Sequence, residues 1–280
     1  VVVSHSGHET EFEIMEKVPG IDVFIGGHSH FGFPKAVEDP YNHTLYGQCY
    51  GNGSAIGAFA LDIDPTTRRI AGYTRNLHTL FEDDFEKDAE VAKIVKKYAD
   101  QVAVEMDKTI GESAVDMGRD YRAESVLGNW VTDVMKKATG ADIAMQNSGG
   151  LRNDIQTGPL TNRSVFNVYP FDNKMVKMEI QGKVVKELME RSVKGDGGIQ
   201  QISGAAIKWN ANRPKGDRVT EIKVGGQPLD LEKWYTFVTI DFIVDRAGWK
   251  ELIAPARNKT YTGMNVRALL VAEVKANSPI

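Results

Sequence analysis

The sequence predicts a mixed protein, partly α/β and partly α+β, in which two domains are joined by one long helix. Three observations predict this fold class. A strand, a helix and a second strand follow one another in the first 25 residues, a charged stretch without glycine or proline runs from Phe85 to Met106, and strand patterns alternate with helical ones beyond it. The expected domains are residues 1–82 and 108–280, with the joining helix at 83–107.

The composition of the chain excludes several classes of function. The chain has 280 residues, of which 41% are hydrophobic and 26% charged, which is enough to bury the cores of two domains. A formal net charge of -4 predicts no overall field that would gather a nucleic acid polymer or an anionic membrane. The single cysteine, Cys49, excludes an internal disulfide framework, and no apolar run approaches the roughly 20 residues that span a bilayer.

The first element is the valine run Val1-Val2-Val3, which is typical of a buried parallel strand. A helical pattern from Glu9 to Val18 ends at Pro19-Gly20, and the apolar run Ile21 to Ile25 is a second strand. Together they form a β-α-β unit. Because the chain begins inside a strand, without the basic start of a signal peptide, we interpret residue 1 as a point of truncation.

The next elements follow from alternation and helical spacing. Ser54 to Ile63 and Arg69 to Asn76 alternate as antiparallel strands around a turn at Asp64-Pro65, and Phe85 to Met106 has the spacing of one exposed helix. A second unit, rich in βαβ connections and forming an α+β domain, is expected beyond it. Its predicted helices and strands are a helix at 124–138, a strand at 142–145, a strand and helix at 175–193, strands at 219–224 and 234–240, and a helix at 265–274.

Four of the six histidines lie in two segments that each follow a strand, Ser4-His5-Ser6-Gly7-His8 and Gly26-Gly27-His28-Ser29-His30. Parallel strands end at the same edge of a sheet, so His5 is expected beside His28 and His30. In extended backbone, residues i and i+2 point to one side, which would aim His28 and His30 at adjacent points. Neutral imidazole is a common ligand of zinc and manganese, so His5, His28 and His30 are the predicted metal ligands. The other histidines, His8, His43 and His78, are expected to be structural or surface residues.

Ser4-His5-Ser6-Gly7 and Gly27-His28-Ser29-His30 resemble the last two signature segments of the calcineurin-like metallophosphoesterases. The resemblance implies that the first domain is the C-terminal part of a metallophosphoesterase β-sandwich with flanking helices. It also implies two divalent ions (Zn, Mn, Mg or Co), with His5 and His28 on one and His30 on the other. The family's remaining ligands and its catalytic His-Asp pair would lie upstream of Val1, so no catalytic residue is assigned in this chain.

The second domain carries two features that suit a nucleotide. In Gln146-Asn147-Ser148-Gly149-Gly150-Leu151-Arg152, adjacent glycines let backbone N–H groups approach a ligand, and the arginine fork matches a phosphate. Phe171 and Phe242 each stand beside polar residues at the end of a segment, where two rings can hold a nucleobase between them. The alternatives are an ordinary turn at the glycines and two rings that fill the core.

Four segments of this domain resemble, in order and spacing, the C-terminal domain of the 5'-nucleotidases: 124–129, 147–152, 169–171 and 240–242. The resemblance implies that Arg152 and Arg122 hold the substrate phosphate and that Phe171 and Phe242 stack on the base. It further implies that the nucleoside is bordered by Asn147, Gly149 and Gly150. In two places the chain departs from the family: Arg122 lies two residues before Glu124 rather than three, and residues 245–249 replace a Gly-Gly-Asp-Gly run.

The prediction for the parent protein is a phosphoric ester hydrolase, periplasmic or extracellular by resemblance, that converts nucleoside 5'-monophosphates or related nucleotides to nucleoside and phosphate. The truncated chain by itself is expected to be inactive. The same scaffold would also suit nucleotide sugars, 2',3'-cyclic nucleotides or thiosulfate-like esters. A non-catalytic nucleotide-binding or interaction module is the alternative from a different class.

Overall fold

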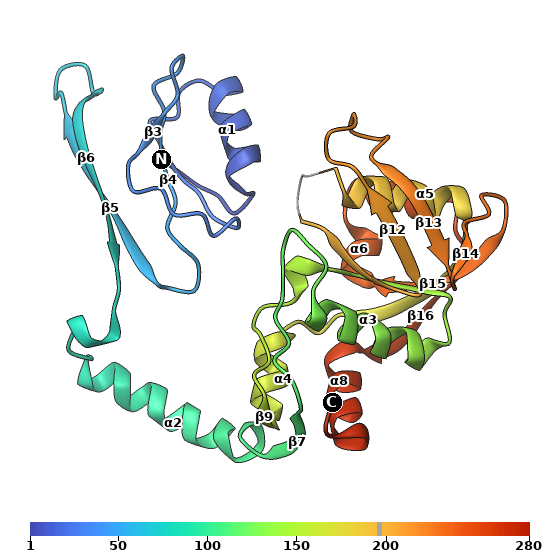
Figure 1. The fold of residues 1–280 in the computed structure, drawn as a ribbon. Helices are drawn as coiled ribbons and strands as arrows, with labels where there is room; N and C mark the ends of the chain where they lie inside the picture. The colour runs from blue at the N-terminus through green and yellow to red at the C-terminus, as the bar shows by residue number, and fades with distance from the viewer. Residues whose placement is uncertain (195–197) are drawn as a thin grey trace. The chain divides into compact units, whose positions relative to one another are not determined.

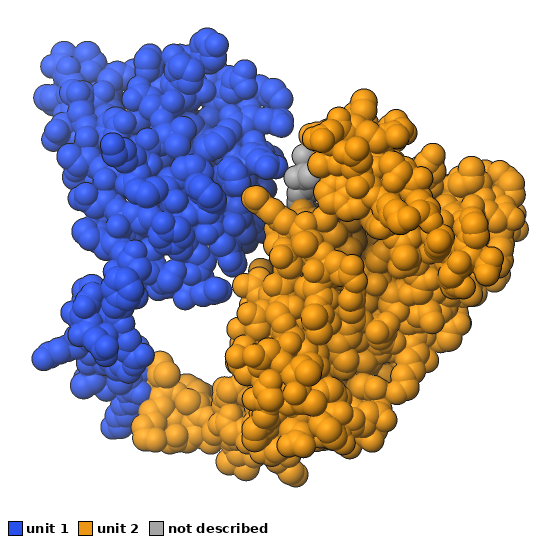
Figure 2. Space-filling model, viewed as in Figure 1, with its two compact units in different colours: residues 1–94 blue, residues 95–280 orange. Residues whose placement is uncertain are grey.

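The computed structural model describes residues 1–194 and 198–280, which separate into two compact units (Figure 1). Unit 1 comprises residues 1–94 and unit 2 residues 95–280 (Figure 2). Helices and sheets occur in both units, so the predicted mixed α and β fold is confirmed. Within the described residues, no helix combines the length and the apolar character that a membrane crossing requires.

Unit 1 contains a four-stranded sheet with the order β1-β2-β4-β3. β1 (Val2–Val3) and β2 (Val23–Ile25) run parallel, with α1 (His8–Lys17) between them in the chain, which confirms the predicted β-α-β unit. β2 also runs parallel to β4 (Leu45–Gly47), and β4 pairs antiparallel with β3 (Val37–Glu38). The loops that follow β1 and β2 therefore leave the sheet at the same edge.

β1 lies at the edge of the sheet, beside β2. Val1 and Val3 are 84% and 80% exposed, whereas Val2 packs against the apolar core of unit 1. The described residues therefore partly bury one of the three valines of the predicted strand. The buried apolar core of unit 1 lies between α1 and the central strands, where Met15, Phe24 and Tyr46 pack together.

The rest of unit 1 is a long antiparallel hairpin of β5 (Ala55–Ile63) and β6 (Ile70–Thr79), as predicted. The Asp64 carboxylate accepts the N–H of Thr66 at 2.7 Å, which closes the turn. After the 3-10 turn Glu82–Asp84 comes α2 (Ala89–Met106), which has no buried residue and matches the exposed helix that the spacing predicts.

Unit 2 is built on a five-stranded sheet with the order β11-β8-β15-β10-β16. Only β8 and β15 pair in parallel, whereas the other three pairings are antiparallel. The α+β domain expected here is confirmed. Its βαβ connections were expected to give parallel strands, and that part was wrong, because an apolar pattern locates a strand but does not give its direction. The sheet strands are β8 (Ile143–Asn147), β10 (Lys174–Gln181), β11 (Gln200–Ser203), β15 (Trp234–Ile240) and β16 (Arg257–Asn265).

Three helices bury the apolar side chains of this sheet. α3 (Val126–Thr139) packs on β8 and β11, α5 (Gly182–Ser192) on β10, and α8 (Val266–Asn277) on β16. The shorter elements are β7 (Thr109–Ser113), β9 (Gly158–Thr161), α4 (Asn162–Val168), β12 (Ala205–Trp209), β13 (Val219–Val224), β14 (Gln227–Pro228), α6 (Asp241–Asp245) and α7 (Lys250–Ile253).

Candidate active site

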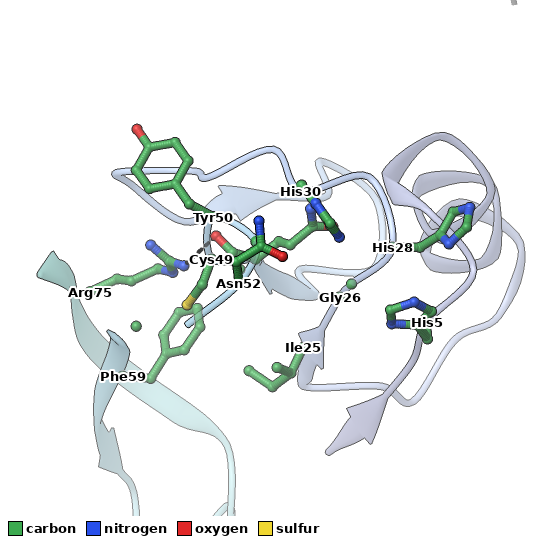
Figure 3. A pocket seen from close by; sticks show the side chains of 15 residues that line it. His5, Ile25, Gly26, His28, His30, Cys49, Tyr50, Asn52, Phe59 and Arg75 are labelled. Carbon is green, nitrogen blue, oxygen red and sulfur yellow. Dashed lines mark hydrogen bonds between the residues drawn. The ribbon is translucent and has the colours of Figure 1, made fainter. Parts of the chain in front are cut away.

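Two of the predicted metal ligands meet at the edge of the sheet in unit 1. The ring centroids of His5 and His28 lie 5.2 Å apart, with the rings edge-on at 75° (Figure 3). The parallel pairing of β1 and β2 continues into the loops, because the N–H of Ser4 donates to the carbonyl of Ile25 at 2.9 Å. This hydrogen bond places the residues that follow β1 beside those that follow β2, as the β-α-β pattern predicts.

His28 and His30 do not have extended backbone. Their φ angles are 72° and 56°, in the left-handed region, which is uncommon for residues other than glycine although asparagine, aspartate and histidine adopt it more often than most. The argument that both imidazoles point to one side was therefore wrong. His28 packs against His5, whereas His30 lies against Gly51, where an added Cβ would come within 2.3 Å of its Nδ1. Strained backbone of this kind costs about 1–3 kcal/mol per residue and gathers at functional sites.

The three histidines line one pocket of about 300 Å³ in unit 1 (Figure 3). None of the described residues that line this pocket is an aspartate or a glutamate. Among residues 1–194 and 198–280, no three histidine, cysteine, aspartate or glutamate side chains are close enough to hold a metal ion together. Neutral imidazole has the donor chemistry that zinc and manganese prefer. The chain thus supplies part of a ligand set, and its described residues do not complete one.

Arg75 on β6 is a cation in the wall of this pocket that the sequence pattern did not single out. Its guanidinium donates to the carbonyls of Gln48, at 3.1 Å, and Phe33, and it lies 5.3 Å from the centre of the Phe59 ring. Burial lowers the pKa of Arg75. Nothing in its local sequence distinguishes it from the arginines on the protein surface, so only the fold reveals its place.

In unit 2, the predicted nucleoside contacts follow β8. The fully buried Gln146 donates through Nε2 to Asn147 Oδ1 at 2.9 Å, which orients the Asn147 amide. The chain then turns through the 3-10 segment Ser148–Gly150. A Cβ on Gly150 would lie 2.5 Å from Gln146 Nε2, so this glycine is required by close packing inside the turn.

The predicted phosphate and base residues Arg152 and Phe171 lie together. The guanidinium carbon of Arg152 is 5.2 Å from the centre of the Phe171 ring, a cation–π distance. Phe171 is 37% exposed, which leaves part of its ring accessible. Arg267, which sequence reasoning missed, fixes this loop by donating to the Phe171 carbonyl at 3.3 Å and pairing with Asp172.

One hydrogen-bond network joins the three predicted binding segments. The hydroxyl of the buried Tyr169 lies 3.2 Å from Gln146 Oε1 and 3.4 Å from Asn173 Oδ1, and Asn173 Nδ2 donates to Asp241 at 2.8 Å. The same Asp241 oxygen accepts the N–H of Phe242 at 2.8 Å. Burial and the Asp241 charge raise the pKa of Tyr169, so it stays a neutral donor. Tyr169 and Asp241 lie inside the segments 169–171 and 240–242 that the sequence singled out, although neither was predicted to be a site residue.

Phe242 is 45% exposed, and the guanidinium carbon of Arg246 lies 5.5 Å from its ring centre. In the part of the chain that the structure describes, the rings of Phe242 and Phe171 are not in contact. The two aromatic segments are thus connected through Asn173 and Asp241 rather than by stacking on each other. A planar group between the rings stays a prediction.

The loop that carries Arg119 and Arg122 runs beside the glycine turn. Met117 and Ile155 form a two-way backbone bridge at 2.8 and 3.0 Å, which aligns this loop with the segment that follows Arg152. Arg119 is held by Asp154, which accepts its N–H at 2.8 Å and approaches its side chain at 3.9 Å. Arg122 is exposed, and its backbone N–H donates to Asp120 at 2.7 Å.

The sequence of this chain is similar to a protein family and to several known proteins. The model of the 5'-nucleotidase C-terminal domain matches residues 105–251. The curated protein "Endonuclease YhcR" of Bacillus subtilis is 30% identical over 233 residues, which cover 82% of this chain and 19% of that protein. "Trifunctional nucleotide phosphoesterase protein YfkN" of the same organism is 29% identical over 238 residues, or 80% of this chain and 16% of that protein.

A solved structure of a 5'-nucleotidase precursor from Thermus thermophilus is similar over nearly the whole chain. Its TM-score is 0.84 at 28% identity, and the match covers 99% of this chain and 61% of that one. The chain therefore spans less than two thirds of each of these relatives. Its match to the solved structure includes both units, the histidine loops as well as the segments around Phe171.

Proposed function

The chain belongs to the 5'-nucleotidase family, and from that premise we propose that the whole protein is a metal-dependent hydrolase of nucleoside 5'-monophosphates or related nucleotides. The products would be a nucleoside and phosphate. A periplasmic or extracellular location is part of the proposal. The observation that supports it most is the network through Tyr169 and Asp241, because it joins the Asn147, Phe171 and Phe242 segments within the residues that the family model matches.

The residues of unit 2 would bind and orient the nucleotide. Arg152 would pair its guanidinium fork with the phosphate, with Arg122 as a second cation. Phe171 and Phe242 would stack on the base, and Asn147, with the turn at Gly149 and Gly150, would border the nucleoside.

Unit 1 would supply the metal ligands. His5 and His28 would share one divalent ion and His30 would hold a second, with further ligands and the catalytic His-Asp pair from a segment before Val1. When bound, such ions provide positive charge and Lewis acidity to a phosphate ester. Since the described residues form no complete ligand group, we expect the 280-residue chain alone to bind zinc weakly and to hydrolyse little or no nucleotide.

The test uses the complete protein and measures phosphate release from AMP with and without zinc or manganese. His28→Asn removes the imidazole but tolerates the left-handed backbone, so we expect metal-dependent turnover to disappear. His78→Ala, an exposed histidine on β6, is the matched control and should keep full activity. Normal turnover of His28→Asn would refute the metal assignment.

Two alternative functions can be tested with the same complete protein. The name of the YfkN relative, a trifunctional nucleotide phosphoesterase, favours a wider range of substrates. A panel of nucleotide sugars, 2',3'-cyclic nucleotides and thiosulfate-like esters tests that range. The alternative from a different class is a nucleotide-binding module without catalysis. Nucleotide binding without bound metal or turnover in the complete protein would establish that alternative.

A further inference from the structure

A buried carboxylate behind the histidine loops has no part in the proposed function so far. Glu11 lies in the first turn of α1, and its side chain is 0% exposed. Moving an ionised carboxylate out of water costs several kcal/mol unless hydrogen bonds replace those of water. Its partners therefore show what this buried charge stabilises.

The two loops that carry His5 and His28 share one oxygen of Glu11. Its Oε1 accepts the N–H of Ser6 at 3.0 Å and the N–H of Gly27 at 3.4 Å. Ser6 directly follows His5, and Gly27 directly precedes His28. A single acceptor thus fixes the distance between the two loops at the point where their imidazoles lie 5.2 Å apart.

The second oxygen of Glu11 continues the network toward His30. The hydroxyl of the buried Tyr46 donates to Glu11 Oε2 at 2.7 Å and lies 2.9 Å from Gln48 Oε1. Gln48 Nε2 donates to the hydroxyl of Ser29 at 2.7 Å. Because Ser29 stands between the two left-handed histidines, the network reaches all three predicted ligands through the residues beside them.

The glycines before His28 provide the space for this network. A Cβ on Gly26 would lie 2.1 Å from the Tyr46 hydroxyl oxygen and 2.3 Å from Glu11 Oε2, and one on Gly27 would lie 2.8 Å from His5 Nδ1. Burial by itself would raise the pKa of Glu11, but the hydrogen bonds from Tyr46, Ser6 and Gly27 lower it, and the net direction is down. The group is therefore an ionised carboxylate at neutral pH.

We propose that Glu11 is a positioning residue for the metal site: its carboxylate sets the separation and orientation of His5 and His28 by holding the N–H groups beside them. The inference rests on the proposed function, since it requires these imidazoles to be metal ligands. Residues that orient metal ligands typically change metal affinity or activity by about 10–100-fold when they are replaced.

The experiment compares Glu11→Gln with Glu13→Gln in the complete protein. Glu13 lies on the same helix, is exposed, and pairs only with Lys17 at 3.3 Å, so it is a matched control. Zinc affinity is measured by competition with a chelator, AMP hydrolysis as kcat and KM, and folding as the Tm without metal. For Glu11→Gln we expect zinc affinity to fall about 10–100-fold and kcat to fall with it, while KM for AMP is unchanged. Glu13→Gln should match the wild type in all three.

A merely structural role would lower the Tm but leave the zinc affinity of the folded protein unchanged. Folded Glu11→Gln with wild-type zinc affinity therefore overturns the proposal. If Glu11→Gln does not fold, Tyr46→Phe decides, because it removes the hydroxyl donor to Oε2 and keeps the ring. Reduced zinc affinity in Tyr46→Phe supports the proposal, and unchanged affinity refutes it. Loss of zinc by His28→Asn with no loss by Glu11→Gln would reject only the role of Glu11, whereas zinc retained by His28→Asn would reject the metal site itself.

Discussion

Gly128 in α3 offers a sharp test of how unit 2 holds its arginine loop. In an ordinary helix, glycine to alanine stabilises by about 1 kcal/mol. Here a Cβ would lie 2.1 Å from Oε1 of the buried Gln201. That oxygen accepts the N–H and the hydroxyl of Ser125 at 3.0 and 3.1 Å, and Gln201 Nε2 donates to the Ala123 carbonyl at 2.9 Å. Gly128→Ala would therefore displace the side chain that holds the loop after Arg122.

The expected magnitude combines three effects. Overpacking a filled site costs about 1–3 kcal/mol. Leaving buried partners of Gln201 without hydrogen bonds costs about 1–3 kcal/mol more, and helix propensity returns about 1 kcal/mol. The net loss is about 3 kcal/mol, which for a domain of this size lowers the Tm by about 6–12 °C.

Thermal unfolding followed by tryptophan fluorescence isolates this effect, because all four tryptophans, Trp130, Trp209, Trp234 and Trp249, lie in unit 2. Gly118→Ala is the matched control: it is exposed, a Cβ there meets nothing within 4 Å, and its Tm should equal or slightly exceed that of the wild type. A Gly128→Ala protein that melts with the wild type would refute the reasoning, because the close contact would then have no energetic weight.

Two further predictions concern unit 2. Phe171→Ala in the complete protein should raise KM for the nucleotide about 5–150-fold with little change in kcat, because a stacked base contributes about 1–3 kcal/mol. Tyr261→Ala, which removes another exposed ring of unit 2, should leave KM unchanged, and equal effects of both would contradict base stacking at Phe171. The hydrogen bond from Arg163 lowers the pKa of Asp107, so NMR titration should place that carboxylate below about 3.9 and Arg163→Gln should raise it. The stabilisation of the folded state by the Asp107–Arg163 pair is present above about pH 3.9 and is lost as pH falls through the folded pKa of Asp107. If Arg163→Gln left the titration midpoint of Asp107 unchanged, this pairing would be contradicted.

The predictable part of the fold consisted of long regular patterns. β13 and β15 were predicted to the residue, because six or seven positions of strand pattern outweigh their local context. β4 was missed although Leu45 and Tyr46 are buried, since three residues after a polar turn carry no measurable period. The direction of the strands in unit 2 was also beyond the pattern, because burial of both faces produces the same apolar run in either direction.

In the candidate site, too, part of the local backbone conformation could not be predicted from the sequence. The two histidine segments were recognisable from their place after strands, and His5 and His28 do lie together. The side on which His30 projects depends on left-handed φ angles at His28 and His30. Histidine adopts such angles more often than most residues, but still in a small minority of cases, so the sequence did not predict them. The links through Tyr169 and Asp241 join residues far apart in the chain, so their pairing became visible only in three dimensions.

The role of the glycines near the candidate site differs from the one that the sequence predicted. The Gly149-Gly150 pair was interpreted as allowing close approach to a ligand, yet the space beside Gly150 is taken by the amide of Gln146. At Gly26 the neighbours are the Glu11 carboxylate and the Tyr46 hydroxyl, and at Gly128 the neighbour is the Gln201 amide. In each case a buried polar side chain occupies the missing Cβ position and, directly or through its partners, orients a loop of the candidate site. Alanine at these positions therefore tests the framework that aims the ligand contacts, and a loss of activity there would not identify the glycine as a ligand contact.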